Sequence, residues 1–257
     1  MKRQCVASVL THLACTCACF RPLSDHQATP TKPLPFWVKP QPKPQQSVCT
    51  LGWVLSSENA HVCGALAMKI TAGLHAQVAA QMAANSVVFS SLASMPQIFS
   101  LTGDPMLLKP QMQDVAMRSL AAAVASTGPN RAITITSAFR TSTQQYLWYM
   151  QGQSKRCSLK LTVPAPGSSS FEAGLAFENA EVEYWRIILA NYGFSSNGGT
   201  EFSFVYPDGI QPDVAQQNLK AFQQLWNKNN PDAQIYADGK FRQQTADALN
   251  KAPCKGW

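Results

Sequence analysis

The sequence predicts an α+β domain, in which helices come first and short strands then alternate with further helices. Apolar residues recur at helical spacing early in the folded part, whereas short β-branched or aromatic runs separate the helical segments that follow. The 257 residues are 46% hydrophobic and only 14% charged, a composition typical of a globular protein. A chain of this length can bury one sizeable core, or one core and a small appendage.

The earliest folded elements are predicted to be two helices. Residues 59–82 are rich in Ala, Leu, Met and Gln, with apolar residues four apart at Leu66, Ile70, Leu74 and Val78. This spacing places the four residues on one face of a single helix. Residues 112–125 predict a second helix, which ends at the Gly and Pro that occupy 128–129.

The later elements alternate between strands and helices. They are a strand over 133–137, a helix over 144–151, a strand over 175–177, a helix over 182–192 and a strand over 202–205. Residues 213–229 and 243–251 then predict two further helices, joined by a turn-rich link over 232–239. The end of the chain is therefore expected to be helical.

The first 48 residues predict a leader and a spacer rather than folded structure. Residues 1–20 begin with a basic pair and continue with a fairly apolar run, which is the outline of a secretory signal. A lipoprotein cysteine at Cys15 or Cys19, and an organelle-targeting or mis-started N-terminus, are the alternatives. Residues 21–48 are proline-rich and predict an extended tether. No long apolar run follows, so we expect no transmembrane helix in the mature chain.

The chain is basic, with a formal net charge of +7 and a pI near 9.0. Such a charge is compatible with an anionic wall polymer, a membrane surface or nucleic acid as a partner. The basic residues are scattered, however, and no run of five or more occurs. No motif interleaves aromatic and basic residues either, so we expect no nucleic-acid partner.

Four cysteines follow the predicted signal: Cys49, Cys63, Cys157 and Cys254. In an exported protein we expect them to form two disulfides, for which three pairings exist. A zinc site built from the same cysteines is the rival interpretation. Their separations of 14, 94 and 97 residues include no Cys-x-x-Cys pair, which favours the disulfides.

Three short motifs occur in order in the second half of the chain. They are Ser137-Ala138-Phe139-Arg140-Thr141 with Gln145 beyond it, the segment from Ser169 to Glu178, and Gly198-Gly199-Thr200-Glu201-Phe202. Their order and spacing resemble the Ser-Ala-Tyr-Arg-Ser, Ser-x-His-x-x-Gly-x-Ala-x-Asp and Asp/Glu-Pro-x-His-Phe motifs of zinc D-alanyl-D-alanine carboxypeptidases of the vancomycin-resistance type. The resemblance implies a domain over 49–207 with the hedgehog/DD-peptidase fold of mixed helices and a small antiparallel sheet.

The same resemblance implies that the metal chemistry is missing. Phe171 and Glu201 stand where the family has its two histidine ligands, Glu178 stands at the aspartate ligand, and Gly198 stands at the general base. Catalytic zinc needs about three protein ligands, with nitrogen ligands prominent. We therefore expect no zinc and no peptidase activity. The alternative is an active metallocarboxypeptidase in which the carboxylates hold an ion.

Three polar residues at matched positions are candidates for substrate binding: Arg140, Gln145 and Ser169. A guanidinium can bind a peptide carboxylate through two parallel hydrogen bonds. The resemblance implies that Arg140 helps to position a substrate. The alternative for Arg140 is a salt bridge with Glu178 or Glu201 that fills the space of the missing metal. The alternative for Ser169 is a role in its own loop.

The C-terminal segment, 208–257, carries a second set of motifs. They are Leu219-Lys220-Ala221-Phe222-Gln223, then Ala237-Asp238-Gly239-Lys240-Phe241, then Thr245-Ala246-Asp247-Ala248-Leu249. These motifs resemble the later part of bacterial peptidoglycan-binding repeats, although Arg242 replaces the second glycine of the usual turn. A helical appendage that packs on the main domain is the alternative.

These features together predict a catalytically degenerate carboxypeptidase-like protein that binds peptidoglycan or cell-wall peptides. We expect it to be secreted, periplasmic or associated with a cell wall, and to use no cofactor. An active metallocarboxypeptidase, and a structural or assembly protein that reuses the fold, are the alternatives. The sequence contains no nucleotide-binding loop, and no Ser-His-Asp or Cys-His set points to another enzyme class.

Overall fold

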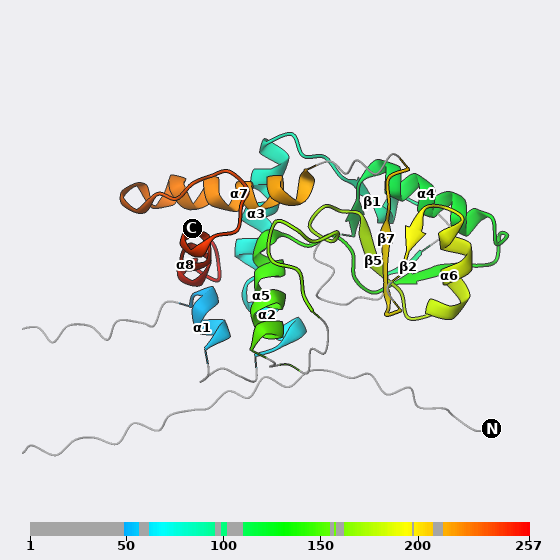
Figure 1. Ribbon diagram of the computed structural model, residues 1–257, viewed down its shortest axis with the longest axis horizontal. Coiled ribbons are helices and arrows are strands. Elements are labelled where there is room, and N and C mark those ends of the chain that lie inside the picture. Colours follow the sequence, from blue (N-terminus) through cyan, green and yellow to red (C-terminus); the bar gives the residue numbers. More distant parts are fainter. Residues whose placement is uncertain are drawn as a thin grey trace, which may run out of the picture. The chain divides into compact units, whose positions relative to one another are not determined.

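The computed structural model describes residues 49–56, 62–95, 99–101, 110–154, 157, 162–196, 198–207 and 213–257 (Figure 1). It confirms the α+β class, because helices gather in one part and small sheets in another. The predicted signal over 1–20 and the predicted spacer over 21–48 lie outside the described residues.

Six of the described helices form a helical lobe. They are α1 (Leu51–Leu55), α2 (Gly64–Ile70), α3 (Ala72–Ala84), α5 (Ser142–Gln153), α7 (Val214–Asn229) and α8 (Gln243–Lys251). Their shared core includes the fully buried residues Leu51, Leu74, Tyr146, Phe222 and Leu249. The two C-terminal helices therefore share one core with helices from the start of the described chain.

The prediction of one continuous helix over 59–82 is wrong. The chain leaves helical geometry at Thr71, where α2 ends and α3 begins. The Thr71 hydroxyl donates to the Ala67 carbonyl at 2.7 Å, a local bond that competes with the helical ladder and bends the chain. The expected apolar stripe is broken as a result, since Leu66 is 46% exposed while Leu74 is buried.

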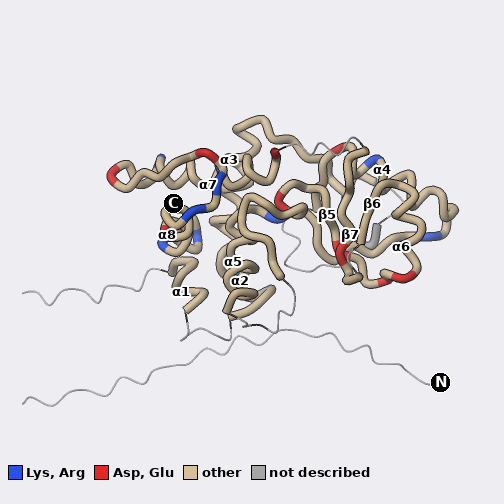
Figure 2. The backbone as a smooth tube through the Cα atoms, in the orientation of Figure 1, with Lys and Arg blue, Asp and Glu red and all other residues tan. Residues whose placement is uncertain are grey.

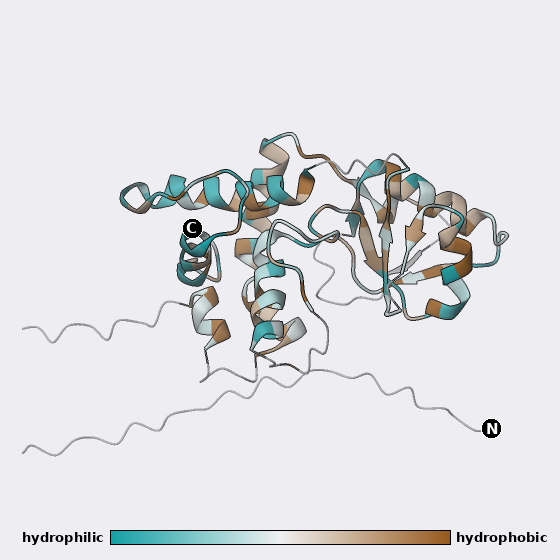
Figure 3. Ribbon diagram, in the orientation of Figure 1, coloured by the Kyte–Doolittle hydropathy of each residue, from teal (hydrophilic) through white to brown (hydrophobic). Residues whose placement is uncertain are grey.

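The remaining elements form a sheet lobe. It contains α4 (Asp114–Ala125), α6 (Val182–Ala190), the antiparallel pair β1 (Ser90–Ser91) and β3 (Gln111–Met112), and the parallel pair β2 (Phe99–Leu101) and β4 (Ile133–Ile135). A third, antiparallel sheet has the order β5 (Ala176–Glu178), β7 (Glu201–Phe204), β6 (Phe194–Ser195). Its inner rings pack together, with Phe177 stacked on Phe202 at 5.6 Å between centroids. Figure 3 shows more hydrophobic colour over this lobe than over α7 and α8.

The other predicted elements agree with the structure to within a few residues. The helices predicted over 112–125, 144–151, 182–192, 213–229 and 243–251 correspond to α4, α5, α6, α7 and α8. The strands predicted over 133–137, 175–177 and 202–205 correspond to β4, β5 and β7. Helix α1 and the strands β1, β2, β3 and β6 were not predicted.

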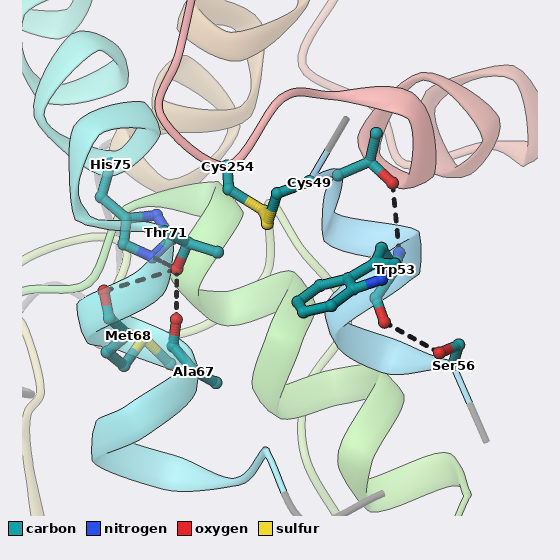
Figure 4. Close-up of a disulfide and its surroundings, with 9 residues drawn as sticks. Cys49, Trp53, Ser56, Ala67, Met68, Thr71, His75 and Cys254 are labelled. Atoms are coloured by element: carbon teal, nitrogen blue, oxygen red, sulfur yellow. Dashed lines mark hydrogen bonds between the residues drawn. A yellow bond between two sulfur atoms is a disulfide. The ribbon is translucent and has the colours of Figure 1, made fainter. Parts of the chain in front are cut away.

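Two disulfides join the four cysteines, as the sequence predicts. The pairs are Cys49–Cys254 and Cys63–Cys157, with Cα atoms 5.4 Å and 5.6 Å apart. The first pair ties α1 to the chain after α8, where the Cys254 amide also donates to the Cys49 carbonyl at 2.9 Å (Figure 4). The structure thus selects one of the three pairings that the sequence left open.

A buried histidine joins α3 to α5 inside the helical lobe. His75 is 1% exposed, and its Nε2 atom lies 2.6 Å from Thr71 Oγ1 (Figure 4). Its Nδ1 atom lies 2.7 Å from Thr143 Oγ1. Because the Thr71 hydroxyl donates its proton to Ala67, it accepts a proton from Nε2, and Thr143 donates to Nδ1. Burial lowers the pKa of His75 to about 3, so the ring is neutral at physiological pH.

Candidate functional site

The fold brings residues from all three sequence motifs together. The segment that follows β4 runs beside the end of β5, because Ser137 and Glu178 form an antiparallel bridge. The Arg140 amide donates to the Phe171 carbonyl at 3.2 Å, which joins the first motif to the second. In the β5–β7 pairing Glu178 lies directly opposite Glu201, which joins the second motif to the third. Residues far apart in sequence therefore meet at one place.

Arg140 lies at the centre of this site. Its Nη2 atom donates to Glu178 Oε1 at 2.7 Å and to Ser137 Oγ at 3.2 Å. The side chain is only 9% exposed, and burial lowers the pKa of the guanidinium against the opposing effect of Glu178. The salt bridge considered as the alternative role of Arg140 is thus present, and Glu178 is the partner.

Aromatic rings cover the guanidinium. The Cζ atom of Arg140 lies 3.7 Å from the centroid of the Phe171 ring and 5.1 Å from that of Trp148. Such stacking holds a guanidinium in place and limits its access to water. Phe171, at the position of a histidine ligand in the resembled family, thus contacts a cation through its ring face.

Arg140 retains unused hydrogen-bonding capacity. Both of its side-chain hydrogen bonds to described residues leave from Nη2. A guanidinium carries five N–H donors, so those on Nη1 and Nε have no acceptor among the described residues. The arginine can therefore keep Glu178 and still offer donors to a second carboxylate.

The two glutamates of the site have different surroundings. Glu178 is paired with Arg140, whereas Glu201 accepts a hydrogen bond from the Ser203 hydroxyl at 2.9 Å. Gly198 lies in the turn before β7 with a left-handed φ of +86°, and it offers no side chain. Charged residues are otherwise sparse along most of the described chain, which is largely tan in Figure 2. The described residues contain no group of three or more His, Cys, Asp or Glu that could hold a metal ion.

A buried carboxylate organises the loop before Phe171. Glu172 is fully buried, and its carboxylate accepts from the Gly167 amide at 2.8 Å and from the Ser169 amide at 3.3 Å. Burial raises the pKa of Glu172 to about 8, although these amides and Arg140 oppose the shift. The Ser169 hydroxyl accepts from the Phe171 amide at 3.2 Å, so Ser169 stabilises the turn that presents Phe171.

Gln145 lies on α5, one turn before Trp148. It is fully buried, and its amide nitrogen donates to the Pro164 carbonyl at 2.8 Å. Its Oε1 atom has no hydrogen-bond partner among the described residues. A buried acceptor without a donor is unusual in proteins, so this oxygen is an unsatisfied polar atom of the site among the described residues.

Sequence reasoning missed three residues of the site. Glu172 is an unspecified position inside the second motif, and only its neighbours gave a signal. Trp148 was assigned to a helix by its surroundings, with no sign that its ring lies over Arg140. Asn218 of α7 is fully buried against the Arg140 backbone, a contact for which the sequence carries no local signal.

Comparisons with known proteins give no relative for this chain. No family model matches it, and no match was found among curated proteins or among solved structures. None of the described helices is long and apolar enough to cross a membrane.

Proposed function

We propose that this chain is a catalytically degenerate D-alanyl-D-alanine carboxypeptidase-like protein that binds peptidoglycan or cell-wall peptides. The proposal includes the hedgehog/DD-peptidase fold and a location outside the cytoplasm, where disulfides persist. One observation carries it: positions of all three motifs meet at Arg140, which contacts Phe171 and Glu178, while Glu178 lies opposite Glu201 in the β5–β7 pairing. Unrelated motif matches would have no reason to converge in space.

The chemistry of the site favours binding over hydrolysis. Phe171 presents a ring where a metal ligand would be needed, and Gly198 presents no base. Arg140 instead supplies a fixed cation with donors to spare, which suits the carboxylate at the end of a wall peptide. Its engagement with Glu178 holds the guanidinium in place before a ligand arrives, which reduces the entropy lost on binding.

The test is calorimetry of a diacetylated Lys-D-Ala-D-Ala tripeptide binding to the wild-type protein and to Arg140→Ala. Loss of a charge-assisted hydrogen bond of about 1.5–3 kcal/mol should weaken binding by roughly ten- to a hundredfold. Arg131→Ala is the matched control, because Arg131 also pairs with a glutamate (Glu181, 2.9 Å) and covers an aromatic ring (Tyr184, 4.1 Å) but belongs to no motif. This control should bind like the wild type.

Other outcomes identify the alternatives. A lower melting temperature with unchanged affinity in Arg140→Ala would reduce Arg140 to a partner of Glu178. One tightly held zinc per chain in elemental analysis, together with release of D-alanine, would establish an active metallocarboxypeptidase. No binding to the tripeptide or to insoluble peptidoglycan would leave a structural or assembly role.

A further inference from the structure

We propose that Asn218, on the C-terminal helix α7, is a positioning residue that holds Arg140 in the binding site. The C-terminal segment would then be part of the site rather than a separate attachment. The proposal rests on the proposed function for its biological meaning, but its structural basis is independent of any ligand.

The side chain of Asn218 uses its full donor capacity on the site. Its Nδ2 atom donates to the Arg140 carbonyl at 2.9 Å and to the Glu172 carbonyl at 3.2 Å. Its Oδ1 atom accepts from the Ser142 amide at 2.8 Å, at the start of α5. The Asn218 carbonyl also accepts from the Ser142 hydroxyl at 3.3 Å. One buried amide thus joins α7 to two site segments.

These bonds fix the backbone from which the guanidinium extends. The Arg140 amide is bound to the Phe171 carbonyl, and its carbonyl is bound to Asn218. Asn218 also binds the residue after Phe171, so it sets the separation of the arginine from the ring that covers it. Without Asn218 the carbonyls of Arg140 and Glu172 would lose this donor in a dry interior, where an unpaired polar group is costly.

Close packing beside Asn218 supports the same conclusion. A Cβ atom added to Gly167 would lie 3.0 Å from the Gly239 carbonyl and 3.1 Å from the Leu219 side chain. Gly167 belongs to the loop that binds the Glu172 carboxylate, whereas Leu219 and Gly239 belong to the C-terminal segment. The C-terminal segment therefore contacts the loop of the site directly.

A second asparagine of α7 provides a matched control. Asn227 Nδ2 donates to the Ile235 carbonyl at 2.8 Å, and its Oδ1 accepts from the Ile235 amide at 2.8 Å. Both bonds stay within the C-terminal segment. Asn227→Ala therefore removes paired side-chain bonds from the same helix without touching the site.

The experiment compares the full chain with Asn218→Ala, Asn218→Asp and Asn227→Ala. The first readout needs no ligand: the guanidinium signal of Arg140 in ¹⁵N–¹H NMR spectra, identified by its loss in Arg140→Ala. We expect a shifted and faster-exchanging signal in both Asn218 variants and an unchanged one in Asn227→Ala. The second readout is tripeptide affinity, which should fall by about tenfold in the Asn218 variants alone.

Asn218→Asp keeps the size of the side chain and the acceptor for Ser142, so it serves if Asn218→Ala fails to fold. An unchanged Arg140 signal in a folded Asn218 variant would overturn the proposal. So would unfolding of both Asn218 variants under conditions in which Asn227→Ala is folded, because Asn218 would then serve the fold alone. A wild-type protein that binds no tripeptide would refute the proposed function, while the NMR comparison would still decide the role of Asn218.

Discussion

The helical lobe and the candidate site around Arg140 are stabilised in different ways. Both disulfides contact the helical lobe, at the start of α1 and just before α2. The residues around Arg140 are instead held by hydrogen bonds, one ion pair and stacked rings. Covalent links restrict the unfolded chain, whereas polar contacts define side-chain positions in the folded one. We therefore expect that removing a disulfide lowers the overall stability, whereas removing a polar contact around Arg140 changes the geometry of the site.

Burial of His75 in the helical lobe and of Glu172 in the candidate site has opposite consequences for pH. His75 has only hydroxyl partners, and burial keeps it neutral by lowering its pKa. Glu172 has amide donors and the nearby Arg140, yet burial still raises its pKa. Burial favours the neutral form in both cases. Since one group is a base and the other an acid, the helical lobe should be sensitive to acid and the site loop to higher pH.

The largest effect should come from removal of the Cys49–Cys254 disulfide. This bond spans 205 residues, and restriction of so long a loop in the unfolded chain is worth about 5 kcal/mol at most in the chain-entropy treatment. We expect the double alanine variant to lose about 2–5 kcal/mol in denaturant unfolding. Removal of Cys63–Cys157, which spans 94 residues, should cost slightly less. Equal stability of wild type and the first variant would contradict this ranking.

An effect of similar size is expected from acid through His75. The ring binds a proton near pH 6.5 in the unfolded chain but only near pH 3 in the folded chain. The unfolded chain therefore binds more protons between these values, and the free energy of unfolding falls as the pH is lowered from 6.5 to 3. The loss should reach roughly 3–5 kcal/mol. In urea unfolding experiments, the free energy of unfolding of His75→Gln should change less between pH 6.5 and pH 3 than that of the wild type. Equal changes in the two proteins would refute the prediction.

The smallest effect of the three is expected through Glu172, with the opposite sign. Its carboxyl loses a proton near pH 4.5 when unfolded and near pH 8 when folded. The Glu172 carboxyl binds more protons in the folded chain in this window, so its contribution to the free energy of unfolding falls as the pH rises from 4.5 to 8. The amide donors stabilise the charged form, and we expect a loss of roughly 2–4 kcal/mol. Glu172→Gln should lose this fall, most clearly between pH 7 and 8, where His75 is largely neutral in both states, and a wild-type slope retained in that variant over this range would assign the effect elsewhere.

Much of the fold could be predicted because its signals are local. Helices α7 and α8 have apolar residues at helical spacing, and α8 begins and ends at the predicted residues. The two-residue strands β1, β3 and β6 are too short to show a sequence pattern of their own and are defined only by the segments that pair with them. The break at Thr71 was missed for a related reason. Its hydroxyl is also bound to His75, and that ring is fixed by Thr143, 68 residues further along the chain.

The site shows the same division between local and distant information. Arg140, Phe171, Glu178 and Glu201 were identified from motifs, in which residue type and spacing suffice. The choice of Glu178 as the partner of Arg140 depends on the bridge between Ser137 and Glu178, which brings two distant segments together. The contribution of Asn218 depends on how α7 packs against a loop, and that packing is a property of the whole fold.

The Cys49–Cys254 bond also gives the protein a mechanical property. The first and the last cysteine of the described chain are joined directly, with the residues around Arg140 on the long loop between them. A pulling force applied to the chain ahead of Cys49 and beyond Cys254 would travel through the sulfur atoms. The helices and the residues around Arg140 would carry none of it. A protein anchored at one end and loaded at the other would therefore keep its site unstrained.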